Sequence, residues 1–350
     1  MARGYFVDIF SGAGGSALGF LQADFKPVGA LDSDKHAVET FESNIKLKPV
    51  LTDAQTFNFR KWSKELGDVD VLVGCPPCQG FSKMNLKNQK NGHADSRNDL
   101  VKVYIDAVKA IDPKVVVFEN VSGMVRRWNG YFKLLTGHLT KLGFKLVWDI
   151  LNAADYGVPQ RRKRLILIGV KKGEPRLPAP THGNPKSRAV KKGLLKPWVT
   201  VKEAIGDLPP IEAGESHPKI PNHRSKKLPE NWLRLIRMIP KNGGSRSDAP
   251  KELWLPCHRK HRGYDDVFGR LWWDKPSVTL TTGCWDPSKG RFVHPEQDRG
   301  LSLRECARLQ GFPDDFVFKG PPTSIARQIG NALPPPLARA IAKVVAEYIQ

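Results

Sequence analysis

The feature that most constrains this chain is an alternation of short apolar runs with helical segments over about its first 170 residues. The runs are rich in β-branched residues and end at turn residues; three of them are YFVDIF (5–10), VDVLVG (69–74) and KVVVFEN (114–120). Strands buried on both faces have this composition, and the segments between them have helical periodicity. The alternation therefore predicts an α/β fold with a doubly wound, mostly parallel sheet.

The character of the sequence changes between residues 179 and 275. Proline and glycine interrupt this segment, and its 20 Lys and Arg residues outnumber its 10 Asp and Glu residues. Regular order returns after it, and the run PLARAIAKVVAEYI (336–349) predicts a C-terminal amphipathic helix. We therefore expect a main domain formed by residues 1–178 plus 321–350, and a smaller, irregular or β-rich domain over 179–320.

Charge and composition narrow the class of protein. The formal net charge is +21, which predicts a polyanionic partner, most simply nucleic acid, over a merely solvated basic surface. No apolar run is long enough for a transmembrane helix, and no signal-peptide cleavage site follows the N-terminus. Five cysteines, an odd number in a long chain, do not suggest a disulfide framework, so we expect a reducing, cytoplasmic location.

A glycine-rich turn, SGAGGSA, follows the first predicted strand and opens a helix. Gly12 and Gly14 fit the fingerprint of dinucleotide-binding turns, and Asp32 ends the next strand, where a carboxylate can accept from ribose hydroxyl groups. S-adenosylmethionine, which also carries an adenosine, requires the same features. The turn alone leaves nicotinamide, flavin and S-adenosylmethionine enzymes open.

The stretch GCPPCQGFS places Cys78 on a proline-stiffened turn directly after a predicted strand. A redox pair would normally have its second cysteine in a helix, and a zinc site needs about four ligands. No second Cys-x-x-Cys exists, and the only other cluster is Cys257, His258 and His261. These observations favour a single nucleophilic Cys78, with Cys75 as a structural neighbour and no metal.

Charged residues stand at the ends of two further predicted strands. Glu119 directly follows a buried run, where a carboxyl group is a candidate catalytic acid or, alternatively, a structural cap. Arg162 and Arg164 precede the run LILIG at alternate positions, so both side chains can point into one pocket if the strand includes them.

Taken together, these blocks resemble the DNA (cytosine-5)-methyltransferases of the bacterial restriction–modification type. The matching blocks follow the family's order from residue 8 to residue 337; they are DIFSGAGG, GCPPCQGFS, DSRNDL, FENVSG, QRRKRLILIG, RECARLQGFPDDF and QIGNALPPPLA. The resemblance implies the fold of S-adenosylmethionine-dependent methyltransferases and a smaller target-recognition domain.

The resemblance also implies roles for the catalytic candidates. Cys78 matches the nucleophile that adds to C6 of a cytosine flipped out of the duplex. Glu119 matches the carboxyl group that bonds N3 of the base. Arg164 matches the arginine that bonds O2, and Arg162 the arginine beside it.

Further matches lie where the family binds S-adenosylmethionine, the implied methyl donor. They are Phe10, Gly12, Gly14, Asp32, Asp53, Leu100 and Asn331. Asp32 matches the ribose carboxylate and Asp53 the residue near the adenine amino group. Ser33 departs from the family, which often has an aromatic residue at that position.

The implied partner is duplex DNA, read by a variable segment over about 179–275, with the 83–98 loop as an alternative reader. A cognate restriction endonuclease acting on the same site is a candidate partner, and we expect a monomer of prokaryotic or phage origin. An RNA (tRNA) cytosine-5 methyltransferase of the same superfamily is the alternative function. A catalytically silent DNA-binding relative is a third interpretation.

Overall fold

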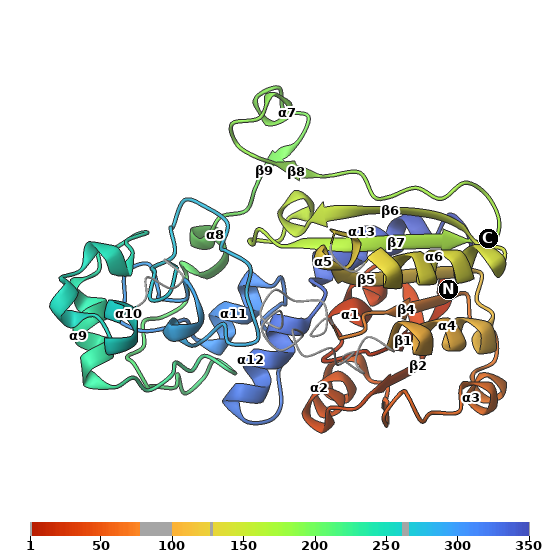
Figure 1. The fold of residues 1–350 in the computed structure, drawn as a ribbon, viewed down its shortest axis with the longest axis horizontal. Helices are drawn as coiled ribbons and strands as arrows, with labels where there is room; N and C mark the ends of the chain where they lie inside the picture. Colours follow the sequence, from red (N-terminus) through yellow and green to blue (C-terminus); the bar gives the residue numbers. More distant parts are fainter. Residues whose placement is uncertain (1, 78–99, 127–128, 261–265, 350) are drawn as a thin grey trace. The chain divides into compact units, whose positions relative to one another are not determined.

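The computed structural model describes residues 2–77, 100–126, 129–260 and 266–349. The chain divides into two compact units (Figure 1). The first contains Met1–Tyr156, Lys163–Pro180 and Ala332–Gln350, and the second contains Gly157–Arg162 and Thr181–Asn331. Residues 321–331, expected with the main domain, belong to the second unit, as does the short segment before Lys163.

One seven-stranded sheet forms the centre of the first unit, in the order β3-β2-β1-β4-β5-β7-β6. The strands are β1 Gly4–Ile9, β2 Phe25–Asp32, β3 Val50–Leu51, β4 Val71–Gly74, β5 Val115–Val121, β6 Lys145–Asn152 and β7 Lys163–Val170. Pairing is parallel from β3 to β5, whereas β7 runs antiparallel to both β5 and β6. The predicted α/β class with a mostly parallel sheet is confirmed. The strand order reverses between β1 and β4, where open α/β sheets place their ligand sites.

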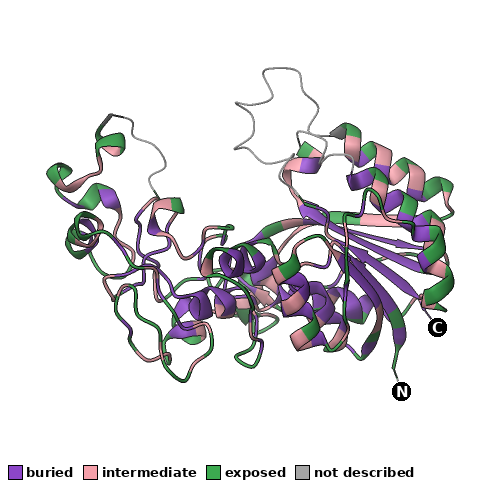
Figure 2. Ribbon diagram, turned by 90° about the horizontal axis from the view of Figure 1, so that it is seen from below, coloured by how far each residue is buried: buried purple, intermediate pink, exposed green. Residues whose placement is uncertain are grey.

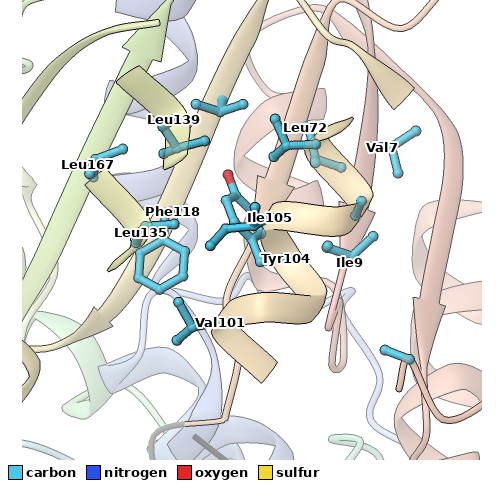
Figure 3. Close-up of a cluster of buried hydrophobic side chains, with 14 of the residues drawn as sticks. Val7, Ile9, Leu72, Val101, Tyr104, Ile105, Phe118, Leu135, Leu139 and Leu167 are labelled. Carbon is cyan, nitrogen blue, oxygen red and sulfur yellow. The ribbon is translucent and has the colours of Figure 1, made fainter. Parts of the chain in front are cut away.

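Helices cover the sheet and bury its apolar strands (Figure 2). They are α1 Gly15–Leu21, α2 Lys35–Ile45, α3 Phe59–Leu66, α4 Leu100–Ile111, α5 Gly123–Arg126, α6 Asn129–Lys141, the 3-10 helix η5 Ala153–Tyr156 and α13 Pro335–Val345. Side chains of α4 and α6 pack with the strands in one core cluster, drawn in part in Figure 3. Helix α13 confirms the predicted C-terminal helix. It packs against α1 so closely that a Cβ on Gly19 would lie 2.4 Å from the Ala338 side chain.

The second unit is irregular, with short helices and little regular pairing in its described part. Its elements are β8 His182–Gly183, α7 Arg188–Lys191, β9 Lys196–Pro197, α8 Val201–Ile205, α9 Glu230–Met238, η6 Arg246–Asp248, η7 Lys251–Leu253, α10 Pro256–Lys260, η8 Pro287–Lys289, α11 Leu303–Leu309 and α12 Pro322–Asn331. A core of its own gathers around Leu235, Ile236 and Phe268, which are fully buried.

Buried arginines satisfy the irregular backbone of this unit. Arg270 is fully buried and donates to the carbonyls of Ile236 and Gln297, both at 2.8 Å, among others. Arg299 is almost fully buried and forms a bidentate ion pair with Glu305, at 2.8 and 2.7 Å. Because a guanidinium group carries five donors, one such side chain can satisfy several carbonyls that lack a sheet or helix partner.

Candidate active site

The candidate active site lies at the carboxyl edge of the sheet, where β1, β4 and β5 end. Gly74 ends β4 in a space that admits no side chain, since a Cβ there would lie 2.4 Å from the ring of Tyr104. The hydroxyl group of Tyr104 donates to the carbonyl of Val117 on β5 at 3.1 Å. Tyr104, which is drawn in Figure 3, therefore fixes the end of β4. The chain continues from there into Cys75 and the two prolines.

Glu119 and Arg164 form an ion pair at this edge. The Nε atom of Arg164 lies 3.0 Å from Oε1 of Glu119, and the two side chains are only 13% and 8% exposed. The pair comes from adjacent antiparallel strands, because Val121 on β5 is in register with Arg164 on β7. A carboxylate and a guanidinium group buried this far are held in one arrangement, with opposite charges that can act on a single bound base.

The loop that leads to the predicted nucleophile is tied to β5. The side-chain amide of Asn120 donates to the carbonyl of Pro76 at 3.2 Å. Cys75 is half-buried beside Glu119: burial raises the pKa of its thiol well above the ordinary value, and the Glu119 charge raises it further. A thiol held neutral is a poor nucleophile, which agrees with the structural role expected of Cys75. Cys78 itself lies outside the described residues.

The glycine turn joins β1 to α1 in a left-handed conformation. Phe10, Gly12 and Gly14 have φ values of 58°, 52° and 93°, and Gly14 caps α1. The amide of Gly12 donates to Oδ2 of Asp32 at 2.8 Å, while the amide of Asp34 donates to Oδ1 at 2.8 Å. A Cβ on Gly12 would meet no atom within 4 Å, so its backbone borders open space. The turn and the carboxylate thus lie together, as a nucleoside ligand requires.

The remaining predicted cofactor residues are spread over three elements. Asp53, in the loop after β3, is exposed and accepts from the amide of Gln55 at 2.9 Å. Leu100 is buried at the start of α4, and Asn331 ends α12 in the second unit. Ser33 is exposed beside Asp32. The roles of these residues toward a cofactor stay predictions.

Arg162 has partners different from those of Arg164. It is 1% exposed, and its two terminal nitrogens donate to the carbonyls of Leu280, at 2.9 Å, and Gly330, at 2.8 Å. These contacts join three segments of the second unit, to which Arg162 belongs. They give Arg162 a structural function, and its expected place beside Arg164 at the base stays a prediction.

Asp8, which the sequence reading did not single out, lies fully buried in β1 below the glycine turn. Its Oδ2 accepts from the hydroxyl of Ser16 at 2.6 Å, while Oδ1 has no hydrogen-bond partner among the described residues. Burial raises the pKa of Asp8 to about 7, against the lowering effect of Ser16. The available signal was the charged residue inside the apolar run YFVDIF.

The described part of the chain contains neither a candidate metal-binding cluster nor a candidate membrane-spanning helix. No three His, Cys, Asp or Glu side chains there lie close enough together to hold a metal ion. No helix among those residues is long and apolar enough to cross a membrane.

This chain is similar in sequence to known proteins over nearly its whole length. A family model for the C-5 cytosine-specific DNA methylases matches residues 4–347. Type II methyltransferase M1.HphI of Haemophilus parahaemolyticus is 37% identical over 97% of this chain and 86% of its own length. Type II methylase M.HgiDII of Herpetosiphon aurantiacus is 32% identical over 99% and 96%.

Solved structures share the fold. An Escherichia coli protein described as a prophage-encoded DNA modification methyltransferase is 26% identical, with a TM-score of 0.69 over 98% of this chain and 99% of that one. The Entamoeba histolytica methyltransferase EhMeth has a TM-score of 0.66 over the full length of both chains. At 13% identity, that second likeness shows the fold alone.

Proposed function

Because this chain belongs to the C-5 cytosine-specific DNA methylases, we propose that it methylates C5 of cytosine within one duplex sequence through a covalent Cys78–C6 adduct on a flipped-out base. S-adenosylmethionine would supply the methyl group as an electrophilic sulfonium. The observation that carries the proposal is the buried Glu119–Arg164 pair, located at the sheet edge from which the Cys75 loop departs.

The chemistry explains why this pair is needed. Cytosine C5 is a weak nucleophile until a thiolate adds to C6, which forms an S–C bond and moves the ring electrons toward C5 and N3. The carboxyl group of Glu119 would carry a proton when the base is bound, hydrogen-bond N3, and transfer that proton to N3 as the thiolate adds, which neutralises the charge created there. After methylation a base removes the C5 proton, the S–C6 bond breaks, and Cys78 leaves as a thiolate.

Arg164 has the donors to act at the same base. Its Nε bonds Glu119 and its Nη1 donates to the carbonyl of Lys163 at 2.8 Å, which uses two of its five N–H groups. A further N–H group can bond O2 of the cytosine while Nε keeps Glu119 in place. Arg164 thereby orients the carboxylate and contributes charge to the addition step.

The glycine turn supports S-adenosylmethionine as the methyl donor. Both oxygens of Asp32 accept from backbone amides, one of Gly12 and one of Asp34, and a carboxylate oxygen retains a second lone pair for a ribose hydroxyl. The open space at Gly12 leaves the backbone accessible. Phe10, packed at the edge of the core, would lie beside the adenine.

Bisulfite sequencing of DNA from cells that express the protein tests the function. We expect protected cytosines in one sequence context only, and no protection with Cys78→Ala. Methyl transfer to tRNA but not to duplex DNA would establish the RNA alternative. A folded protein that leaves every cytosine unprotected would contradict the proposal. A cognate endonuclease would cut the same sequence when it is unmethylated.

A further inference from the structure

We propose that the segment 182–197, here called the basic finger, is a docking element for the phosphate backbone of duplex DNA, with Leu194 as an apolar contact at its end. The inference rests on the proposed function and names a particular DNA contact for it. In Figure 1 the basic finger is a loop closed at its base by β8 and β9, with α7 at its outer end.

The charged side chains of the basic finger are all positive. From residue 175 to residue 202 the sequence contains no Asp or Glu, whereas Glu174 and Glu203 flank it. Five cations of the basic finger are exposed: Lys186, Arg188, Lys191, Lys192 and Lys196. Within the described chain none of the five forms an ion pair, so the described carboxylates do not neutralise their charge. Arg188, Lys191 and Lys192 stand three and four residues apart, which groups them on one helical face.

This exposed charge differs from the charge of three other cations in the same unit, which are buried or paired. Arg270 is fully buried and occupied by backbone carbonyls. Lys226 is paired with Asp286, and Lys241 with Asp298. Only cations that reach solvent can release counterions from DNA, so the basic finger is better suited to phosphate contacts than these residues.

The basic finger is ordered by its own bonds. The side chain of Ser187 caps α7 by accepting from the amide of Val190. Gly193 ends the helix in the left-handed conformation, with φ at 72°, and its amide donates to the carbonyl of Val190 at 2.9 Å. The amide of Leu194 donates to the carbonyl of Ala189 at 2.9 Å, which completes a Schellman motif.

Leu194 is the unusual residue of this motif. The residue after the left-handed position usually packs against the helix, yet Leu194 is 74% exposed. Its neighbour Leu195 instead points inward, 3.1 Å from the Cβ position of Gly183. An exposed leucine surrounded by cations can contact a base step in a DNA groove while the cations contact the flanking phosphates. Apolar side chains of DNA-binding proteins insert between base steps in this way.

Fluorescence anisotropy of a labelled random-sequence duplex, titrated with the full-length protein over a range of salt concentrations, tests the inference. Each phosphate contact contributes about 0.9 to the slope of log affinity against log salt. Lys191→Ala/Lys192→Ala should therefore lower the slope by roughly two units, and should weaken binding roughly tenfold per contact at about 0.1 M salt. Lys191→Arg/Lys192→Arg should restore both quantities.

Two more variants separate charge from apolar contact. Leu194→Ala should weaken binding several-fold without a change of slope, and Leu194→Met should retain affinity. The matched control is Lys61→Ala/Lys64→Ala on α3, which removes the same net charge from two exposed lysines of the first unit. This control should leave the slope within error of the wild type.

The outcomes separate this inference from the proposed function. If the wild type methylates duplex DNA and the basic finger variants keep its salt slope, the basic finger is not a DNA contact and the function stands. If the α3 control lowers the salt slope by the same amount, the effect depends only on the net charge of the protein, and the inference is overturned. Loss of binding to phosphatidylserine vesicles with an unchanged duplex slope would assign the segment to a membrane surface. A wild type that methylates no duplex DNA overturns the proposed function first.

Discussion

Replacing Asp8 with asparagine should stabilise the protein at pH 8 much more than at pH 5. The Asp8 carboxyl is fully buried, and its pKa is raised from 3.8 to about 7. At pH values between 3.8 and about 7, the Asp8 carboxyl is ionised in the unfolded chain and protonated in the folded chain. Stability therefore falls as pH rises from about 4 to about 7 and is level above that range. At 1.36 kcal/mol per pH unit, the whole loss amounts to about 4 kcal/mol.

Asparagine cannot ionise, and its oxygen can still accept from the Ser16 hydroxyl as Oδ2 of Asp8 does. The difference in unfolding free energy between Asp8→Asn and wild type should thus grow by about 3 kcal/mol between pH 5 and pH 8. Urea unfolding followed by circular dichroism measures it, with amide hydrogen exchange in β1 as a readout specific to the first unit. Asp106→Asn, an exposed aspartate on α4, is the matched control and should show no such growth. Equal differences at both pH values would refute the reasoning.

Three other changes test separate parts of the account. Glu119→Gln should lower turnover by about 10²-fold or more while leaving S-adenosylmethionine binding nearly intact, and near-normal turnover would exclude Glu119 as the group at N3. The pKa of Glu305 is lowered to about 2, burial being outweighed by the Arg299 charge and hydrogen bonds, so its stabilisation holds above about pH 4.5 and is lost toward pH 2. The stability gap between wild type and Glu305→Gln should therefore narrow by about 2 kcal/mol from pH 6 to pH 3, and a constant gap would show no linkage. Exchange of residues 179–275 for those of a relative should change the methylated sequence and not the methylated atom, as bisulfite sequencing would show; methylation of the original site would place recognition elsewhere.

The sheet could be predicted from the sequence because buried strands require continuous apolar runs, and the glycine turn because a left-handed backbone favours glycine. The direction of β7 could not, since LILIG has the same composition whether the strand runs parallel or antiparallel. The burial of Asp8 could not be predicted, since nothing in the sequence shows that its partner Ser16, on α1, lies against β1.

The net charge of the second unit could be predicted from composition, but which of its cations bond buried carbonyls and which are exposed could not. Composition counts Arg270 and Lys191 alike, yet one satisfies buried carbonyls and the other is exposed. Arg162 shows the same limit: its spacing in the sequence does not reveal that its guanidinium group donates to two carbonyls of the second unit. Only packing decides which cations remain available to a polyanion.

Covalent trapping on a duplex with 5-fluorocytosine at the target position tests the central claim most directly. The thiolate can add to C6 and the methyl group can transfer, but fluorine at C5 cannot leave as a proton, so the adduct persists. We predict a covalent complex that forms only with S-adenosylmethionine present, with the modified base mapped by mass spectrometry to Cys78. An adduct at Cys75, or efficient methylation of ordinary duplex DNA with no trapped complex, would contradict the account.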